Sequence, residues 1–228
     1  DNGSLLLVGD NSTGLADDNA ANTLTGGSGN DQLLGMGGND VLSGGAGDDV
    51  FYISMQPANV GETPIAYGGA GTDSAVLDFS AFSSVVGTAD YGIGYWLAVT
   101  QPTGQYYQVA LVGVENVTLY GGSGDDIFYR YASSGNNTLV GNGGNDTLYA
   151  GAGNDTLDGG AGNDVLQGGG GNDLLVGGQG NDTLTGGAGS DRFDYNNINE
   201  GGDTITDFAP GLGGDVLDIK DVLVGYTA

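Results

Sequence analysis

The sequence contains no cysteine and no histidine, and three of its 228 residues are Lys or Arg. Without cysteine the chain can form neither a disulfide nor a thiolate metal site, and without histidine it lacks the commonest ligand of transition metals. The 29 Asp and Glu residues give a formal net charge of −26. Nucleic acids and anionic membrane surfaces bind proteins largely through Lys and Arg, so this charge excludes them as partners. Divalent cations bound by oxygen atoms remain as the natural counter-ions.

Long apolar runs are missing as well. No stretch approaches the roughly 18 apolar residues of a membrane-spanning helix. The first residues, DNGSLLLVGD, lack the basic start and the long apolar segment of a secretory signal peptide. The 49 glycines and the high charge would suit a disordered acidic linker, but a linker does not place a large aliphatic side chain at a fixed period.

A nine-residue pattern, G-G-x-G-x-D-x-U-x with U a large apolar residue, repeats in two arrays. The first array runs from Gly26 to Tyr52. The second begins with GGSGDDIFY at 121–129, skips the two residues at 130–131, and then continues without a slip from Ala132 to Asp194. An isolated nonad, GGAGTDSAV, occupies 68–76. The pattern is typical of calcium-binding parallel β-helices.

Each place in the nonad has a physical reason. Glycines at the first, second and fourth places permit a tight turn with positive φ and let backbone carbonyl groups converge, and the Asp at the sixth place adds a carboxylate. Because side chains alternate along a strand, the eighth residue points inward while the seventh and ninth point outward. The predicted core is therefore one apolar row: Leu33, Leu42, Phe51, Phe128, Leu139, Leu148, Leu157, Leu166, Leu175, Leu184 and Phe193.

One apolar side chain in nine residues buries too little surface to offset the entropy of ordering the backbone. Bound metal must supply much of the difference, and carboxylate and carbonyl oxygens favour Ca²⁺, which takes about six to eight oxygen ligands. If two nonads make one turn, each ion lies between residues two repeats apart. The predicted pairs are Asp31 with Asp49, Asp126 with Asp146, Asn137 with Asp155, Asp146 with Asp164, Asp155 with Asp173, Asp164 with Asp182, and Asp173 with Asp191.

The sequence thus predicts about 7 to 9 bound Ca²⁺ ions, of which the one at Asn137 is expected to be the weakest because an amide lacks charge. The candidate side-chain ligands are Asp31, Asp40, Asp49, Asp73, Asp126, Asn137, Asp146, Asp155, Asp164, Asp173, Asp182, Asp191 and Asp203. The candidate carbonyl ligands are those of Gly27, Gly29, Gly122, Gly124, Gly153, Gly160, Gly162, Gly169, Gly171, Gly178 and Gly180.

These repeats resemble the RTX (repeats-in-toxin) β-rolls of proteins that bacteria export by type I secretion. The resemblance implies an all-β, right-handed parallel β-roll that crosses the secretion machinery unfolded, without an N-terminal signal peptide, and folds on calcium binding outside the cell or at the bacterial surface. Residues 201–225 look like the segment that follows the repeats in large RTX adhesins and precedes their secretion signal. We expect this segment to cap the roll through Ile205, Phe208, Val216, Leu217 and Ile219. Asp203, Asp207 and Asp218 are expected either to bind the terminal ions or to form a plain acidic cap.

We expect five regions: a lead-in at 1–25, the first array at 26–52, an interrupted coil with an inserted β-hairpin at 53–120, the second array at 121–194, and a cap at 195–228. The ending GYTA looks like a cut, so we expect the chain to be part of a larger protein whose secretion signal follows. In the interrupted coil, two alternating strands joined by a turn at 101–104 are predicted within Tyr95–Tyr120. The aromatic residues of this region form either a sugar-binding platform or the buried face of the hairpin: Tyr91, Tyr95, Trp96, Tyr106 and Tyr107.

We expect no enzymatic activity, because the sequence has no histidine for a triad or an H-E-x-x-H zinc site and no serine in G-x-S-x-G. The preferred hypothesis is a monomeric, calcium-dependent folding module of a type I secreted adhesin or similar exoprotein. The alternatives are a carbohydrate- or ice-binding module and an accessory domain of a secreted hydrolase or epimerase. The outward seventh positions do not form the regular threonine ladder that ice binding would need.

Overall fold

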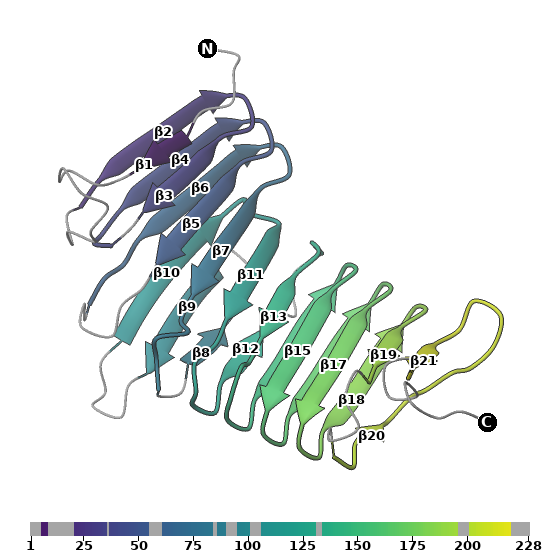
Figure 1. The fold of residues 1–228 in the computed structure, drawn as a ribbon. Coiled ribbons are helices and arrows are strands. Elements are labelled where there is room, and N and C mark those ends of the chain that lie inside the picture. The colour runs from purple at the N-terminus through teal and green to yellow at the C-terminus, as the bar shows by residue number, and fades with distance from the viewer. Residues whose placement is uncertain are drawn as a thin grey trace.

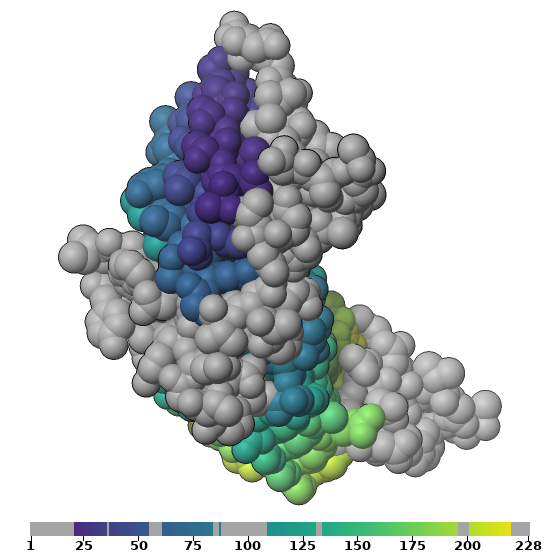
Figure 2. Space-filling view, turned by 90° about the vertical axis from the view of Figure 1, so that its left-hand side faces the viewer, coloured from purple at the N-terminus to yellow at the C-terminus, as the bar shows by residue number. Residues whose placement is uncertain are grey.

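The computed structural model describes residues 6–8, 21–35, 37–54, 61–83, 86–89, 95–100, 106–130, 134–195 and 201–219. The regular elements of these residues are β-strands, and none of the described residues forms a helix long and apolar enough to cross a membrane. The strands stack in two layers from β1 and β2 at one end to β20 and β21 at the other (Figure 1). In the space-filling view the first array lies towards one end of this stack and the second array towards the other (Figure 2).

Two sheets make up the layers, and consecutive repeat strands alternate between them. Sheet A contains, in spatial order, β1 (Leu6–Val8), β3 (Gln32–Gly35), β5 (Val50–Ser54), β7 (Ser74–Asp78), β11 (Asn116–Tyr120), β13 (Thr138–Val140), β15 (Thr156–Ala161), β17 (Leu174–Gln179), β19 (Arg192–Asp194) and β21 (Val216–Asp218). Sheet B contains β2 (Thr23–Ser28), β4 (Val41–Ala46), β6 (Ile65–Ala70), β10 (Tyr106–Val112), β9 (Tyr95–Thr100), β8 (Val86–Ala89), β12 (Ile127–Tyr129), β14 (Thr147–Ala152), β16 (Val165–Gly170), β18 (Thr183–Ala188) and β20 (Thr204–Ile205).

The strand register follows the repeat. Leu157 of β15 pairs with Leu175 of β17, and Leu166 of β16 pairs with Leu184 of β18, in parallel in both cases. Residues two nonads apart are therefore neighbours, so two nonads make one turn of the coil. The predicted all-β parallel β-roll is confirmed.

The core lies between the two sheets. Every apolar side chain of the predicted inward row is at most 1% exposed. The period-two rule explains this row, because the residues on either side of each core residue point outward. Residues between the two arrays extend the same core, among them Phe79, Phe82, Val117 and Leu119.

The region between the arrays continues the coil and adds an insertion. Strand β7 pairs with β5 and with β11, and β11 pairs with β13, so sheet A passes directly from one array to the other. In sheet B, β9 lies antiparallel to both β8 and β10 and separates the arrays. The two predicted hairpin strands are therefore present as β9 and β10. Tyr91 and the side chains of Tyr95, Trp96, Tyr106 and Tyr107 lie outside what the structure describes, so a sugar-binding platform there stays a prediction.

The segment after the second array adds one strand to each sheet, β20 and β21, but its apolar side chains stay partly exposed. Ile205 packs against the core, and the rings of Phe208 and Phe193 lie 6.0 Å apart. Leu217 pairs with Phe193 at the end of the apolar row, while Val216, Leu217 and Ile219 stay 51%, 45% and 39% exposed. The reason is that β21 is the last strand of sheet A, so no following turn of the described chain packs onto it.

Candidate metal-binding rows

The sixth-position residues lie buried in the turns that precede the strands. Those before sheet A strands form row A: Asp31, Asp49, Asp73, Asn137, Asp155, Asp173 and Asp191. Those before sheet B strands form row B: Asp40, Asp126, Asp146, Asp164, Asp182 and the partly buried Asp203. All except Asp203 are at most 2% exposed. Because successive turns stack in register, each row runs along one edge of the roll.

In both rows, the Oδ1 atom of a carboxylate accepts a backbone hydrogen bond from the row member one turn earlier. The backbone N–H of Asp146 donates to Oδ1 of Asp164 at 2.7 Å, and that of Asp164 donates to Oδ1 of Asp182 at 2.8 Å. The same bond joins every predicted pair, at 2.6 to 2.9 Å. It also joins the isolated nonad to the first array, since the backbone N–H of Asp49 donates to Oδ1 of Asp73 at 2.8 Å. The structure therefore brings together each pair that the sequence predicted.

The second carboxylate oxygen remains available in most members of the rows, although at Asp126 it accepts the N–H of Gly122 at 2.8 Å. Within the described residues, Oδ2 has no hydrogen-bond partner at Asp49, Asp73, Asp146, Asp155, Asp164, Asp173, Asp182, Asp191 and Asp203. Leaving a buried polar atom unsatisfied costs about 1 to 3 kcal/mol, and more for a charged group. A repeated arrangement of this kind indicates a ligand that binds these oxygens.

Glycine at the first place of the nonad creates space beside this oxygen. A Cβ atom on Gly159 would meet the Oδ2 of Asp164 and would lie 2.6 Å from the carbonyl oxygen of Gly177. On Gly141 it would meet the Oδ2 of Asp146 and lie 2.6 Å from the carbonyl oxygen of Gly159. A carboxylate of one turn and a carbonyl of the next therefore border the same small space, which a larger side chain would fill.

The candidate carbonyl ligands lie in the same turns. In one group, each carbonyl oxygen would contact a Cβ atom placed on a glycine of the following turn: Gly27, Gly29, Gly124, Gly153, Gly160, Gly162, Gly169, Gly171 and Gly180. Gly178 packs on the carbonyl of Gly160, and the carbonyl of Gly122 accepts a hydrogen bond from Gly143 at 3.2 Å. First-position carbonyls, such as that of Gly177, border the free carboxylate oxygens as well, and they were not among the predicted ligands.

These sites suit a hard cation. In the described part of the chain, no group of three or more acidic side chains gathers at one point, so carbonyl oxygens would have to complete the coordination. Oxygen ligands from carboxylates and backbone carbonyls are those that Ca²⁺ prefers. The donor set and the space beside each Oδ2 therefore fit Ca²⁺.

Two row members were missed. The N–H of Asp73 donates to Oε2 of Glu115 at 2.8 Å, and that of Asp191 donates to Oδ1 of Asp215 at 3.0 Å. Both acidic side chains extend row A across turns of unequal length. Asp215 had a signal in the sequence, because GGDVL at 213–217 keeps the D-x-U spacing of a nonad.

The three acidic residues left open at the C-terminal end differ in their contacts. Asp203 joins row B by accepting the N–H of Asp182 at 2.9 Å. Asp207 accepts the N–H groups of Gly186 and Gly187 with its two oxygens, and Asp218 forms an ion pair with Arg192 at 2.8 Å. Of the three, Asp203 has the arrangement of the repeat carboxylates.

A second, exposed ladder follows the fifth position of the nonad. The N–H of Asn163 donates to Oδ1 of Asn145 at 2.9 Å, and the N–H of Asn181 donates to Oδ1 of Asn163 at 2.9 Å. The direction is opposite to that of the Asp rows, because here the later turn donates to the earlier one. These bonds stabilise the turns without metal, although the fifth position is variable in the nonad pattern.

Burial changes the pKa of three carboxylates of the rows when no cation is bound. Burial raises the pKa of Asp146 and Asp173 to about 7 and that of Asp164 to about 6. The neighbouring carboxylates of the row raise these pKa values further, whereas the backbone hydrogen bond lowers them. The unfolded pKa is about 3.9, so protonation favours the folded state. Protonation of these carboxylates therefore stabilises the metal-free fold fully below about pH 4. This stabilisation is lost as the pH rises through 6 to 7.

We predict that acid and calcium compete. Since Ca²⁺ binds the ionised carboxylates, the calcium concentration that half-folds the chain should rise as the pH falls from about 8 to about 5. Without calcium, the chain should gain β structure on acidification over the same range. Circular dichroism at several pH values, with calcium titrated into metal-free protein, measures both effects. A midpoint that does not change with pH would contradict this assignment of the buried carboxylates.

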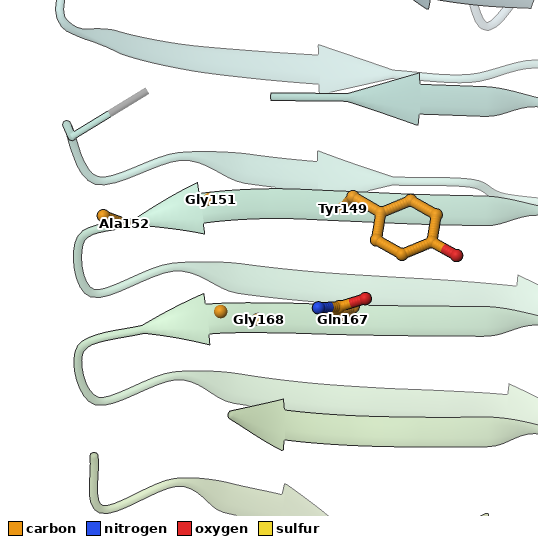
Figure 3. Close-up of a pocket in the computed structure, with 6 residues that line it drawn as sticks. Tyr149, Gly151, Ala152, Gln167 and Gly168 are labelled. Atoms are coloured by element: carbon orange, nitrogen blue, oxygen red, sulfur yellow. The ribbon is translucent and has the colours of Figure 1, made fainter. Parts of the chain in front are cut away.

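A small pocket lies over β14 and β16 of sheet B. It has a volume of about 220 Å³ and is lined by Tyr149, Gly151, Ala152, Gln167, Gly168 and Gly169. The ring of Tyr149 lies along β14, and Gln167 lies beside it on β16 (Figure 3). The ring also stacks on Tyr129, with centroids 5.0 Å apart. This lining offers one phenol and one amide, which assigns no reaction to the pocket.

Comparison with known proteins agrees with the geometry of the rows. The family model of the RTX calcium-binding nonapeptide repeat matches four times, at residues 17–51, 112–130, 131–166 and 167–197. These matches cover more than half of the 228 residues. No curated protein matches the chain. With its two-nonad turns and its buried Asp rows, this chain belongs to the family of RTX calcium-binding nonapeptide repeat proteins, whose repeats form a calcium-binding module.

Proposed function

We propose that the chain is a folding switch that is unfolded where calcium is scarce and folds outside the cell when Ca²⁺ binds in rows A and B. The observation that carries this proposal is the set of buried carboxylates whose Oδ2 atoms have no hydrogen-bond partner in the described part of the chain. Buried charges need a counter-charge, and the whole chain has three Lys and Arg residues against 29 acidic ones. Divalent cations supply that charge.

The ligands we assign to Ca²⁺ are the carboxylates of Asp31, Asp40, Asp49, Asp73, Asp126, Asp146, Asp155, Asp164, Asp173, Asp182, Asp191 and Asp203, with carbonyl oxygens of the glycine turns. Bound Ca²⁺ supplies the positive charge that links one turn to the next. The residues of the chain contribute the rest: Oδ1 fixes the turn register, first-position glycine leaves room, and the apolar row closes the interior. Folding and metal binding are then one event.

The biological setting that we propose is type I export of a larger exoprotein, with this chain near the C-terminal end of an adhesin or similar protein. Support comes from the charge: without calcium, the acidic side chains repel one another and keep the chain extended. An extended chain can pass through a secretion machinery, and extracellular calcium can then fold it. We assign the module no catalytic role, because most of the buried acidic side chains in the described residues already belong to the rows.

Counting bound ions tests this function. At about 1 mM free calcium, equilibrium dialysis is expected to give about 7 to 9 Ca²⁺ per chain. Magnesium at the same concentration serves as the control, because Mg²⁺ demands near-octahedral geometry and releases its water reluctantly, so it should not fold the chain. Two or fewer calcium ions on a fully folded chain would refute the proposal.

A further inference from the structure

Arg130 is the largest side chain that is fully buried in the described part of the roll, at 1% exposure. It lies at the start of the row A turn that contains Asn137. Its N–H donates to the carbonyl of Tyr149 at 2.8 Å, and Tyr129 pairs with Tyr149, so Arg130 lies beside Ala150 in the next turn. Ala150 occupies the first place of its nonad. Arg130 therefore occupies the place that glycine holds in most other turns.

That place determines where the side chain points. At Gly141 and Gly159, a Cβ atom would meet the free oxygen of the sixth-position Asp of the same turn. In the Asn137 turn the side chain of Arg130 begins at this point, and its Nη2 lies 3.5 Å from Oδ1 of Asn137. The guanidinium thus enters the space that borders the metal ligands in the other turns.

Asn137 differs from the other row members in its hydrogen bonds. Its Nδ2 donates to the carbonyl oxygens of Gly135 at 3.0 Å and Ala150 at 3.3 Å, and to Oδ1 of Asp155 at 3.1 Å. Its Oδ1 accepts the N–H of Val117 at 3.2 Å. The carbonyl of Ala150 corresponds to that of Gly159 or Gly177 in the neighbouring turns, where it borders a free carboxylate oxygen. Here the amide of Asn137 already satisfies it.

The charges of this turn also disfavour a bound divalent cation. Asn137 removes one negative charge from row A, and Arg130 adds a positive charge that cannot be lost at physiological pH. Burial raises the pKa of Asp155, and the hydrogen bonds with Asn137 and the charge of Arg130 lower it. A turn that has lost an anion and gained a cation attracts a divalent cation less than any other turn of its row.

From these contacts we propose that Arg130 replaces a calcium ion between the Asn137 and Asp155 turns. The inference rests on the proposed calcium rows and replaces the weak ion expected at Asn137. The guanidinium and the amide hold the two turns together, so this joint near the start of the second array forms without metal. Elsewhere in the rows the same link requires Ca²⁺.

Variants that restore the ordinary nonad test this proposal. Arg130→Gly combined with Asn137→Asp removes the guanidinium and supplies the missing carboxylate. Equilibrium dialysis is expected to show a gain of about one Ca²⁺ per chain. Asn137→Asp alone should show no gain, because Arg130 then pairs with the new carboxylate, and Arg192→Gln is the control for loss of an arginine elsewhere. A gain in Asn137→Asp alone, or none in the folded double variant, would overturn the proposal.

The wild-type protein provides a second test if the double variant does not fold. Crystals grown in calcium and measured for anomalous scattering should show ions between other turns of rows A and B, with none between the Asn137 and Asp155 turns. If an ion lies at that place and ions also lie between other turns, the proposed role of Arg130 is disproved and the proposed calcium function stands. Absence of ions from every turn would instead disprove the proposed calcium function.

Discussion

Asp164→Ala is expected to lower the free energy of unfolding by about 4 to 6 kcal/mol in about 1 mM calcium. Asp164 takes part in two steps of row B: it accepts the N–H of Asp146 and donates its own N–H to Asp182. Its loss removes a carboxylate from two adjacent ion positions, each contributing about 1.4 kcal/mol for a Kd near 10⁻⁴ M. It also leaves the buried N–H of Asp146 without its acceptor, at a cost of about 1 to 3 kcal/mol.

Asp164→Asn separates these two effects, because the amide keeps an oxygen for the N–H of Asp146. In calcium this variant should lose the metal contribution of about 3 kcal/mol. Without calcium near pH 8 it should be no less ordered than the wild type, since burial disfavours the ionised Asp164. Asp158→Asn is the matched control, because Asp158 lies at the ninth, outward position. Urea unfolding in calcium and circular dichroism after chelation measure the series. Equal stability of Asp164→Asn and the wild type in calcium would refute the ligand assignment.

Gly162→Ala is expected to cost about 2 to 3 kcal/mol through the backbone alone. Gly162 has a φ of 145°, and a Cβ atom there would meet the carbonyl oxygen of Gly144 in the preceding turn. Gly170→Ala is the control, because a Cβ atom at Gly170 would meet nothing within 4 Å. It should change stability by less than about 0.5 kcal/mol. Thermal unfolding in saturating calcium compares the two variants, and equal effects would show that close stacking of the turns is unimportant.

Much of the roll was predictable because one period determines several structural features. The eighth-position row predicted the core, and the sixth-position row predicted which carboxylates lie together. The prediction also held at Asp126 and Asp146, which are 20 residues apart rather than 18. Skipping the two residues at 130–131 kept the turns in register there.

Other features could not be predicted because they depend on turns of irregular length. Asp73 meets Glu115, 42 residues later, after the antiparallel insertion of β8 to β10, and no spacing in the sequence indicates that partner. Asp218 was a candidate ligand, but it pairs with Arg192 on the neighbouring strand, and Asp215 extends row A instead.

Arg130 is a clearer example of a feature that the repeat could not predict. In the sequence it belongs to a two-residue interruption, so the repeat assigns it no place. The strand register puts Arg130 in the first place of the Asn137 turn, which is two residues longer than the other turns of the array. There its guanidinium lies beside the amide of Asn137. A charged side chain in an interruption of a repeat can therefore occupy a site that the repeat itself builds.

The claim that calcium folds this chain is tested most directly by titrating Ca²⁺ into the decalcified protein and recording the β-sheet circular dichroism and the bound ions in the same samples. With about eight sites, metal would contribute roughly 11 kcal/mol at about 1 mM calcium, which is comparable to the whole stability of a domain. We predict that the metal-free chain lacks β structure near pH 8 and that both signals rise together over one range of calcium concentration. A full β-sheet signal before any calcium is added would contradict the account.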